Sequence, residues 1–406
     1  MAVGLRYPEN ILPVRGLELA VVSAGIYPKK RPDTVLLSID QAGTCAAVFT
    51  QNAFCAAPVQ VARLHMASGT PRYCLINAGN ANAGTGERGY SDAIRICKRL
   101  AELTHTSTSR ILPFSTGVIG EYLPVEKIFD ALPELLSGLD ENRWIECATA
   151  IMTTDTIPKV VSRTIEIGGN KITITGMAKG SGMIKPDMAT MLAFVATDAT
   201  VEQPALMKIL QYAVTKTFNR ICVDGDTSTN DACVLIATGA VKTEPVSDIA
   251  HEDFLRLRDA IVDVCAYLAR AIIRDGEGAS KFVTISVKQG NTTGECLAVA
   301  YSIATSPLVK TALFASDPNW GRILAAVGRS GLNDFDISRV RITINDICIV
   351  EKGTRNESYT ESQGRAELEK EELLMQIYLG RGAVEEVLWT CDLSFDYVRI
   401  NAEYRT

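Results

Sequence analysis

The segment between residues 179 and 192 joins a glycine-rich loop to a threonine at the head of an apolar run. It begins Lys179-Gly180-Ser181-Gly182, contains Pro186, and ends Ala189-Thr190-Met191-Leu192. A constrained loop can press the Ala189 carbonyl against the Thr190 hydroxyl, which attacks it; water then cleaves the resulting ester and frees the Thr190 amine. That amine, with a reference pKa of about 7.7–8.0, can take the proton of its own hydroxyl. The pattern indicates an N-terminal threonine nucleophile, although a threonine that only opens a β-strand has the same local signature.

Histidine and cysteine chemistry have little support in the sequence. His65, His105 and His251 have neither a nucleophile-elbow serine nor a second ligand at helical spacing beside them. Each is interpreted as a single surface or core residue. The eleven cysteines form no C-x-x-C pair, and most lie in apolar surroundings, which is typical of reduced core residues in a cytosolic protein. We therefore expect no metal site and a base other than histidine.

Eight ordered blocks resemble the ornithine acetyltransferase family of arginine biosynthesis, and together they extend over essentially the whole chain. The nucleophile segment matches through Met177-Ala178-Lys179-Gly180 and Met188-Ala189-Thr190-Met191-Leu192. The other blocks are Asn77–Ala83, Ser115–Gly120, Met152–Thr156, Val223–Asp231, Asp275–Lys281, Ser316–Arg322 and Asn401–Thr406. Eight blocks in the same order are a highly specific match.

The resemblance implies self-cleavage between Ala189 and Thr190 into chains 1–189 and 190–406, which stay together as a heterotetramer with two copies of each. It also implies ping-pong acetyl transfer, in which Thr190 takes acetyl from N2-acetylornithine and passes it to glutamate. Some family members also accept acetyl-CoA. We interpret this chain as bifunctional, although the sequence itself does not reveal acetyl-CoA use. No metal or organic cofactor is expected, because Thr190 carries the acetyl group.

Two further residues match the family's oxyanion hole, Thr116 and Gly117. The resemblance implies that they stabilise charge on the acyl oxygen during transfer. They follow an expected short strand in Ser115-Thr116-Gly117, a pattern that describes a plain β-turn equally well.

The family's substrate contacts match Thr153, Lys179, Thr190, Glu277, Asn401 and Thr406. Lys179 and Glu277 are the charged pair, which suits an amino-acid substrate carrying a carboxylate and a free amine. Their local sequence leaves other interpretations open. A lysine in a glycine loop is usually solvated, and Glu277 lies in a loop that follows a long expected helix. The last six residues resemble a frayed tail.

Two other patterns suggest different chemistry. Residues Gly84–Gly89 satisfy G-x-G-x-x-G between an expected strand and helix, but no acidic residue follows about 20 positions later, so a glycine-rich turn is favoured over a dinucleotide site. Asp224, Asp226 and Asp231 lack the glycine and glutamate spacing of a calcium loop. We interpret that cluster as a hydrogen-bonded loop that supports the nucleophile strand.

The elements that position these residues predict an α/β protein, mixed, with α+β-like layers and largely antiparallel sheets. Two alternating stretches, 160–167 and 171–177, flank Gly168-Gly169-Asn170 and predict a hairpin. Further strands are expected over 35–39, 46–50, 59–62, 73–77, 111–114, 191–197, 233–238, 281–287, 340–349 and 384–398. Helices are expected over 90–103, 124–136, 144–152, 203–217, 254–274 and 366–379. The predicted domains are 1–280, which carries the nucleophile, and 281–406, whose tail returns to the active site.

The composition of the chain limits the classes of molecule that it is expected to bind. The 406 residues carry a net charge of −6 with scattered basic residues, which favours small polar metabolites over nucleic acid or an anionic membrane. No apolar run reaches the roughly 18 residues that span a bilayer, and a cytoplasmic location is expected. Three alternatives stay open: a self-processing amidohydrolase or aminopeptidase, a nucleotide-binding oxidoreductase built on 84–89, and a purely structural or binding protein.

Overall fold

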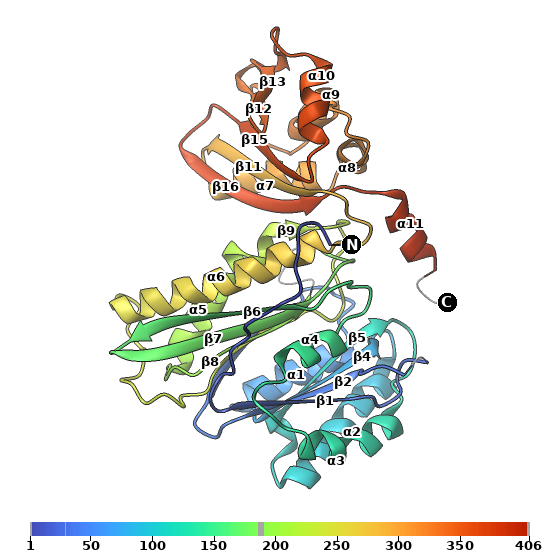
Figure 1. The fold of residues 1–406 in the computed structure, drawn as a ribbon, viewed down its shortest axis with the longest axis vertical. Helices are drawn as coiled ribbons and strands as arrows, with labels where there is room; N and C mark the ends of the chain where they lie inside the picture. The colour runs from blue at the N-terminus through green and yellow to red at the C-terminus, as the bar shows by residue number, and fades with distance from the viewer. Residues whose placement is uncertain (1, 29, 186–190, 404–406) are drawn as a thin grey trace.

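The computed structural model describes residues 2–28, 30–185 and 191–403, which form three β-sheets with helices on their faces (Figure 1). The first sheet has the order β1 (Leu17–Val22), β2 (Thr34–Ile39), β4 (Tyr73–Asn80), β5 (Ile111–Val118). The second has the order β3 (Thr44–Phe49), β10 (Ala232–Ala237), β8 (Leu192–Thr197), β7 (Asn170–Lys179), β6 (Lys159–Ile167). The third has the order β14 (Thr354–Arg355), β13 (Ile347–Glu351), β12 (Arg341–Ile344), β15 (Glu372–Tyr378), β11 (Phe282–Gly290), β16 (Val384–Cys391), β9 (Ile221–Cys222).

The first two sheets stack face to face and share an apolar core. Phe114 from β5 and Phe194 from β8 meet edge to face in that core, with ring centroids 5.1 Å apart. Helices α2 (Gly86–Thr104) and α3 (Val125–Ser137) cover the outer face of the first sheet, while α5 (Gln203–Lys216) and α6 (Glu252–Arg274) cover the outer face of the second. Helices α1 (Ala57–Ala67) and α4 (Trp144–Ala150) pack beside the sheets. The result is a four-layered α/β/β/α body.

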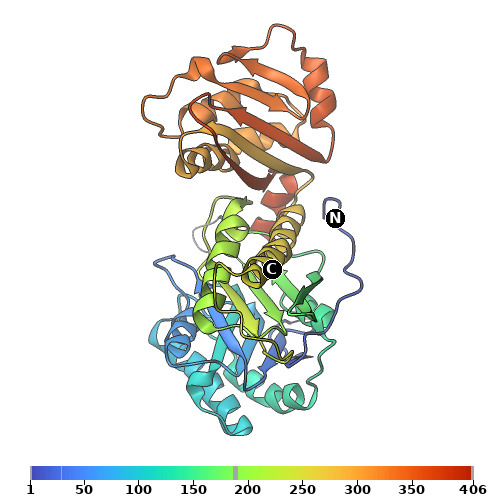
Figure 2. The ribbon, with the colours of Figure 1, turned by 90° about the vertical axis from the view of Figure 1, so that its left-hand side faces the viewer.

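The third sheet forms a separate lobe with its own core (Figure 2). Helices α7 (Thr293–Ala304), α8 (Pro307–Phe314), α9 (Trp320–Gly328) and α10 (Glu361–Leu368) belong to this lobe, and α11 (Phe395–Ala402) follows it in the chain. Both ribbon views place α11 at the level of the junction between the lobe and the layered body. The division of the chain into domains at residue 280 stays a prediction.

The predicted α/β class with largely antiparallel sheets is confirmed; parallel pairs occur between β4 and β5, β8 and β10, β11 and β15, and β9 and β16. The predicted hairpin is β6–β7. Its two-residue connection, Gly168-Gly169, has φ of +56° and +75°, the left-handed conformation that tight hairpins require. The long amphipathic helix is α6, with Leu257, Ile261, Val264 and Leu268 buried along one face.

Four predicted elements are wrong. The expected strand over 340–349 is two antiparallel strands, β12 and β13, joined by a turn at 345–346. Residues 59–62 belong to helix α1 and not to a strand: Pro58 occupies its first turn, where a fixed φ favours helix initiation. Residues 366–379 do not form one helix, because α10 ends at Leu368 and β15 follows with alternating buried residues. The expected strand over 384–398 ends at Cys391, and α11 begins after Ser394, whose hydroxyl caps it.

None of the described helices, taken singly, is long and apolar enough to cross a bilayer. Helices α7 and α8 together, which are bent by 60° at their junction, reach the required length and apolar composition, by those two criteria only.

Candidate active site

The predicted nucleophile segment leads into strand β8. Ala189 and Thr190 lie outside the described residues, as does Thr406. The described chain resumes at Met191, a buried residue whose carbonyl accepts a hydrogen bond from the Ala232 amide at 3.0 Å. Strand β8 then runs between β7 and β10 in the middle of the second sheet. The strand predicted behind the nucleophile is therefore present and is fixed at its first residues.

A cavity of about 290 Å³ lies near the ends of these strands. Six residues predicted from the family resemblance line it: Thr116, Gly117, Thr153, Lys179, Glu277 and Asn401. They come from five segments, namely the end of β5, the loop after α4, the end of β7, the loop after α6, and α11. Positions 285 residues apart in the sequence therefore face one space of small-metabolite size.

Thr116 and Gly117 lie near the end of strand β5, where they pair with Ala78 and Gly79 of β4, and not in a turn. Gly117 has φ of +132°, and a Cβ there would lie 2.3 Å from the Gly79 carbonyl carbon, so no other residue fits without displacement. Asn230, which precedes β10, donates from its side-chain amide to the Ala81 carbonyl at 2.6 Å and the Ser115 carbonyl at 2.9 Å. Asn230 thus holds the end of β5, in the first sheet, against the second sheet.

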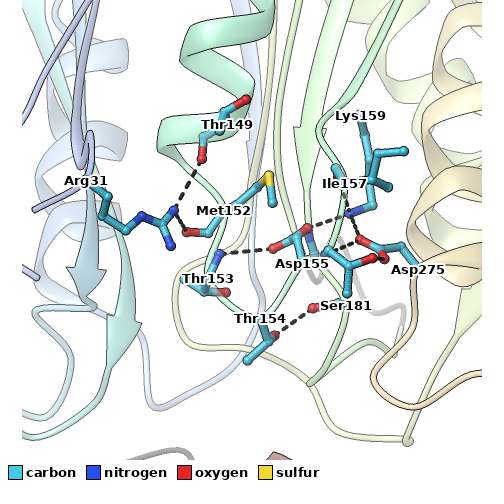
Figure 3. A network of polar contacts seen from close by, with 12 residues as sticks. Arg31, Thr149, Met152, Thr153, Thr154, Asp155, Ile157, Lys159, Ser181 and Asp275 are labelled. Carbon is cyan, nitrogen blue, oxygen red and sulfur yellow. Dashed lines mark hydrogen bonds and ion pairs between the residues drawn. The ribbon is translucent and has the colours of Figure 1, made fainter. Parts of the chain in front are cut away.

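Beside Thr153 lies a buried ionic network formed by Asp155, Lys159 and Asp275 (Figure 3). The Lys159 amine contacts one carboxylate oxygen of Asp155 and one of Asp275, each at 2.6 Å, and all three side chains are almost wholly buried. The other bonds of Asp155 reach the site: it accepts from the Thr153 amide at 3.1 Å and the Gly180 amide at 2.7 Å. One buried carboxylate therefore ties together two segments that line the cavity.

The charges in this network stabilise one another. Burial alone would raise the pKa of Asp155, but the nearby Lys159 and Lys179 charges, with hydrogen bonds from Lys159 and Gly180, hold that pKa well below its usual range. Burial would lower the pKa of Lys159, and the two carboxylates of Asp155 and Asp275 raise it above its ordinary value instead. Asp155 and Lys159 therefore stay ionised at neutral pH.

Glu277 closes another wall of the cavity. It is buried, its amide donates to the Ser181 carbonyl at 2.8 Å, and its carboxylate accepts from the Asn401 side chain at 2.7 Å. Gly182 lies against it: a Cβ at that position would be 2.4 Å from the Glu277 carboxylate carbon. Any side chain at 182 would therefore displace the acid from the cavity.

The remaining sequence patterns have structural explanations. His65 is buried with Nδ1 2.7 Å from the Ile111 carbonyl oxygen, His105 ends α2 in a left-handed conformation, and His251 caps the start of α6. Nine of the eleven cysteines are buried and all are unpaired. Of the pattern at 84–89, Gly84 and Thr85 precede α2, and Gly86–Gly89 lie in its first turn. Over the part of the chain that the structure describes, no group of three or more acidic, histidine or cysteine side chains is placed to bind a metal.

Sequence reasoning missed four residues that hold the site together: Asp155, Lys159, Asn230 and Asp275. Three of them lie inside the blocks that carry the family resemblance, which is the signal that could have singled them out. Lys159 lies outside every block, and its partner Asp275 is 116 residues away.

Known proteins of one family match this chain in sequence and in structure. A family model described as "ArgJ family" matches residues 18–406. The arginine biosynthesis bifunctional protein ArgJ of Pseudomonas fluorescens is 53% identical over 406 residues, covering 100% of both chains. The ArgJ protein of Methylococcus capsulatus is 53% identical over 98% of this chain and 97% of its own. A crystal structure of arginine biosynthesis bifunctional protein argJ from Bacillus halodurans is 38% identical with a TM-score of 0.51, covering 53% of this chain and 100% of that chain.

Proposed function

Because this chain belongs to the ArgJ family, we propose that it is an acetyltransferase of arginine biosynthesis that moves acetyl from N2-acetylornithine to glutamate. One observation carries this proposal. The six described residues that the family resemblance assigns to the reaction, drawn from five segments, line a single cavity of about 290 Å³. An unrelated function would not require them to converge.

The first step is self-cleavage. The Thr190 hydroxyl attacks the Ala189 carbonyl carbon, the peptide C–N bond breaks, and its nitrogen leaves as the Thr190 amine. Water hydrolyses the ester, so that Ala189 gains a carboxylate and Thr190 regains its hydroxyl. The length of the Bacillus halodurans chain supports this step: it is fully covered by 53% of this chain, and 190–406 makes up 217 of the 406 residues, the same share.

Acetyl transfer then uses the freed threonine. Its amine takes the hydroxyl proton while the oxygen attacks the acetyl carbonyl of N2-acetylornithine. The oxyanion is stabilised at Thr116–Gly117, and the proton goes to the departing ornithine amine. The glutamate amine attacks the acetyl-Thr190 ester in turn, which releases N-acetylglutamate and restores the hydroxyl.

The cavity walls suit a small zwitterion. The Lys179 ammonium lies on the wall formed by β7 and can bind the substrate carboxylate, while Glu277 lies on the wall formed after α6 and can bind an amine. Thr153 and Asn401 supply hydrogen-bonding groups, and Thr190 and Thr406 complete the substrate contacts. No cofactor takes part in this sequence of steps. Acetyl-CoA is a second acetyl donor. The processed chains assemble as a heterotetramer in the cytoplasm. The reaction involves no nucleic acid and no membrane.

The test is the mass of the denatured protein, followed with substrates. We expect two chains that share 43.9 kDa between residues 1–189 and 190–406, with Thr190 as the new N-terminus. N2-acetylornithine should add one acetyl group to the second chain, and glutamate should remove it. Thr190→Ala should give one intact, inactive chain. An intact chain that still transfers acetyl would contradict the amine as base, and hydrolysis that glutamate leaves unchanged would favour an amidohydrolase.

A further inference from the structure

The Asp224 carboxylate is bonded to the loop that precedes the nucleophile segment. Its Oδ2 accepts from the Met183 amide at 2.6 Å and its Oδ1 from the Ile184 amide at 2.9 Å. The neighbouring Val223 amide donates to the Ile184 carbonyl at 2.7 Å. Residues 183 and 184 are thus held through three backbone groups by two consecutive residues of the segment that leads from β9 to β10.

This part of the loop needs such support, because Met183 is strained. Its φ is +55°, the left-handed region that costs an L-residue with a Cβ roughly 1–2 kcal/mol. Its side chain is 39% exposed, so packing contributes little to fixing that conformation. The hydrogen bond from the Met183 amide to the charged Asp224 carboxylate stabilises this conformation more than packing of the exposed side chain does.

The same segment also holds the chain on the far side of the scissile bond. Met191 accepts the Ala232 amide at 3.0 Å, and β8 then pairs in parallel with β10. The described chain is therefore held at Ile184 and again at Met191 by residues 223–232. Attack within a chain is fast only when the reacting atoms are held about 3–3.5 Å apart. Releasing one end would let the segment adopt many unreactive conformations.

Helix α11 reaches this support through Tyr397, whose hydroxyl donates to Asp224 Oδ2 at 3.2 Å. Burial, with the adjacent Asp224 carboxylate, raises the pKa of Tyr397, so the hydroxyl keeps its proton and remains a donor. No residue of α11 is fully buried. Its polar contacts include this one and that of Asn401 with Glu277, and Phe395 at its start meets Phe314 edge to face.

We propose that Asp224 is a positioning residue for self-cleavage: its carboxylate fixes the loop before the scissile bond, and Tyr397 adds helix α11 to that support. The inference rests on the proposed function, since it concerns cleavage at Ala189–Thr190. It assigns Asp224 no contact with the reacting atoms.

The experiment compares cleavage kinetics of the full chain in three variants, followed by denatured mass from cell-free synthesis onward. Asp224→Asn keeps the shape of the side chain but loses the charge and one acceptor, and it should slow cleavage about tenfold to a hundredfold. Tyr397→Phe removes only the hydroxyl and should slow cleavage about threefold to tenfold. Asp226→Asn is the matched control: Asp226 lies in the same loop with an exposed side chain, and cleavage should match the wild type.

Two further measurements separate positioning from general damage. After Asp224→Asn has been left to cleave to completion, its kcat per cleaved chain should stay near the wild-type value, and its thermal midpoint should be close to that of Asp226→Asn. Wild-type cleavage by Asp224→Asn would overturn the inference and leave the proposed function standing. If Asp224→Asn does not fold, wild-type cleavage by Tyr397→Phe overturns it. A wild-type chain that never cleaves contradicts both.

Discussion

At the scale of single residues, the site depends on a lysine that does not line it. Lys159 is buried between Asp155 and Asp275, and through them it is linked to the Thr153 and Gly180 amides on one side and the Thr156 amide on the other. Removing one partner of a buried ion pair costs far more than the pair contributes net, because the remaining charges are left without compensation.

Lys159→Met should therefore lower the free energy of unfolding by about 3–5 kcal/mol and raise the KM for N2-acetylornithine, because the Thr153 and Gly180 segments lose their common anchor. Urea unfolding and steady-state kinetics measure the two effects. Lys171→Met, on an exposed position of β7, is the control and should change neither. A Lys159→Met protein as stable as the wild type would show that the two carboxylates need no cation.

The same network makes a prediction about pH. The pKa of Asp155 is lowered in the folded state, so its contribution is present above the unfolded value of about 3.9 and is lost as pH falls through the folded pKa. The pKa of Lys159 is raised, so its contribution is present below about 10.4 and is lost as pH rises further. The stability difference between wild type and Asp155→Asn should be constant near neutral pH and shrink below about pH 4. Urea midpoints from acid to neutral pH measure it, and a difference that grows in acid would contradict the assignment.

At the scale of elements, the ends of strands from two different sheets must be held together. The end of β5 carries Thr116 and Gly117, and Asn230 before β10 donates from its side-chain amide to the Ser115 carbonyl in β5 and to the Ala81 carbonyl after β4. Packing between the sheets sets the distance between them, whereas these two hydrogen bonds set how the end of β5 faces the cavity.

Asn230→Asp tests that bridge, because it keeps the side-chain shape and places a carboxylate against two carbonyl oxygens. We expect kcat per cleaved chain to fall about tenfold to a hundredfold, less than the roughly hundredfold to thousandfold loss when an oxyanion donor is removed outright. Asn333→Asp, at an exposed position of the C-terminal lobe, is the matched control. Equal kcat values in the two variants would show that the end of β5 keeps its geometry without the Asn230 amide.

At the scale of the whole molecule, the second sheet interleaves the two predicted chains. Its order β3-β10-β8-β7-β6 places β10 and β8, from 190–406, between β3 and β7, from 1–189. Each junction is a full backbone ladder, β10 with β3 and β8 with β7. Both strands from the second chain are buried along their whole length.

Cleaved protein should consequently remain one particle, because separating the chains would break two ladders and expose two buried strands. Native mass and gel filtration should show both chains together at high salt and on dilution, and they should part only with the loss of the circular dichroism signal in urea. Dissociation of folded chains in dilute buffer would contradict this interleaving.

The sequence by itself determined the nature of the chemistry and the elements with a strong local pattern. Gly168 and Gly169 between two alternating stretches specify the β6–β7 hairpin, and a sustained helical period specifies α6, because both signals depend only on neighbouring residues. Eight ordered blocks identify the family without any knowledge of tertiary contacts. A short apolar run such as 59–62 satisfies a strand and a helix equally well, and so do the leucines and methionine of 372–378. For 59–62, Pro58 in the first turn favours the helix, whereas for 372–378 the surface against which the segment packs decides between them.

Tertiary structure alone decided how the site is assembled. Nothing local indicates that Lys159 neutralises Asp275, that Asn230 bridges two sheets, or that Gly182 leaves room for Glu277, since these partners are between 95 and 149 residues apart. Their meeting depends on the order of strands in the sheets and on the stacking of the layers. Hydrogen bonds and ion pairs act over a few ångströms, so their partners are fixed only once the whole chain has folded.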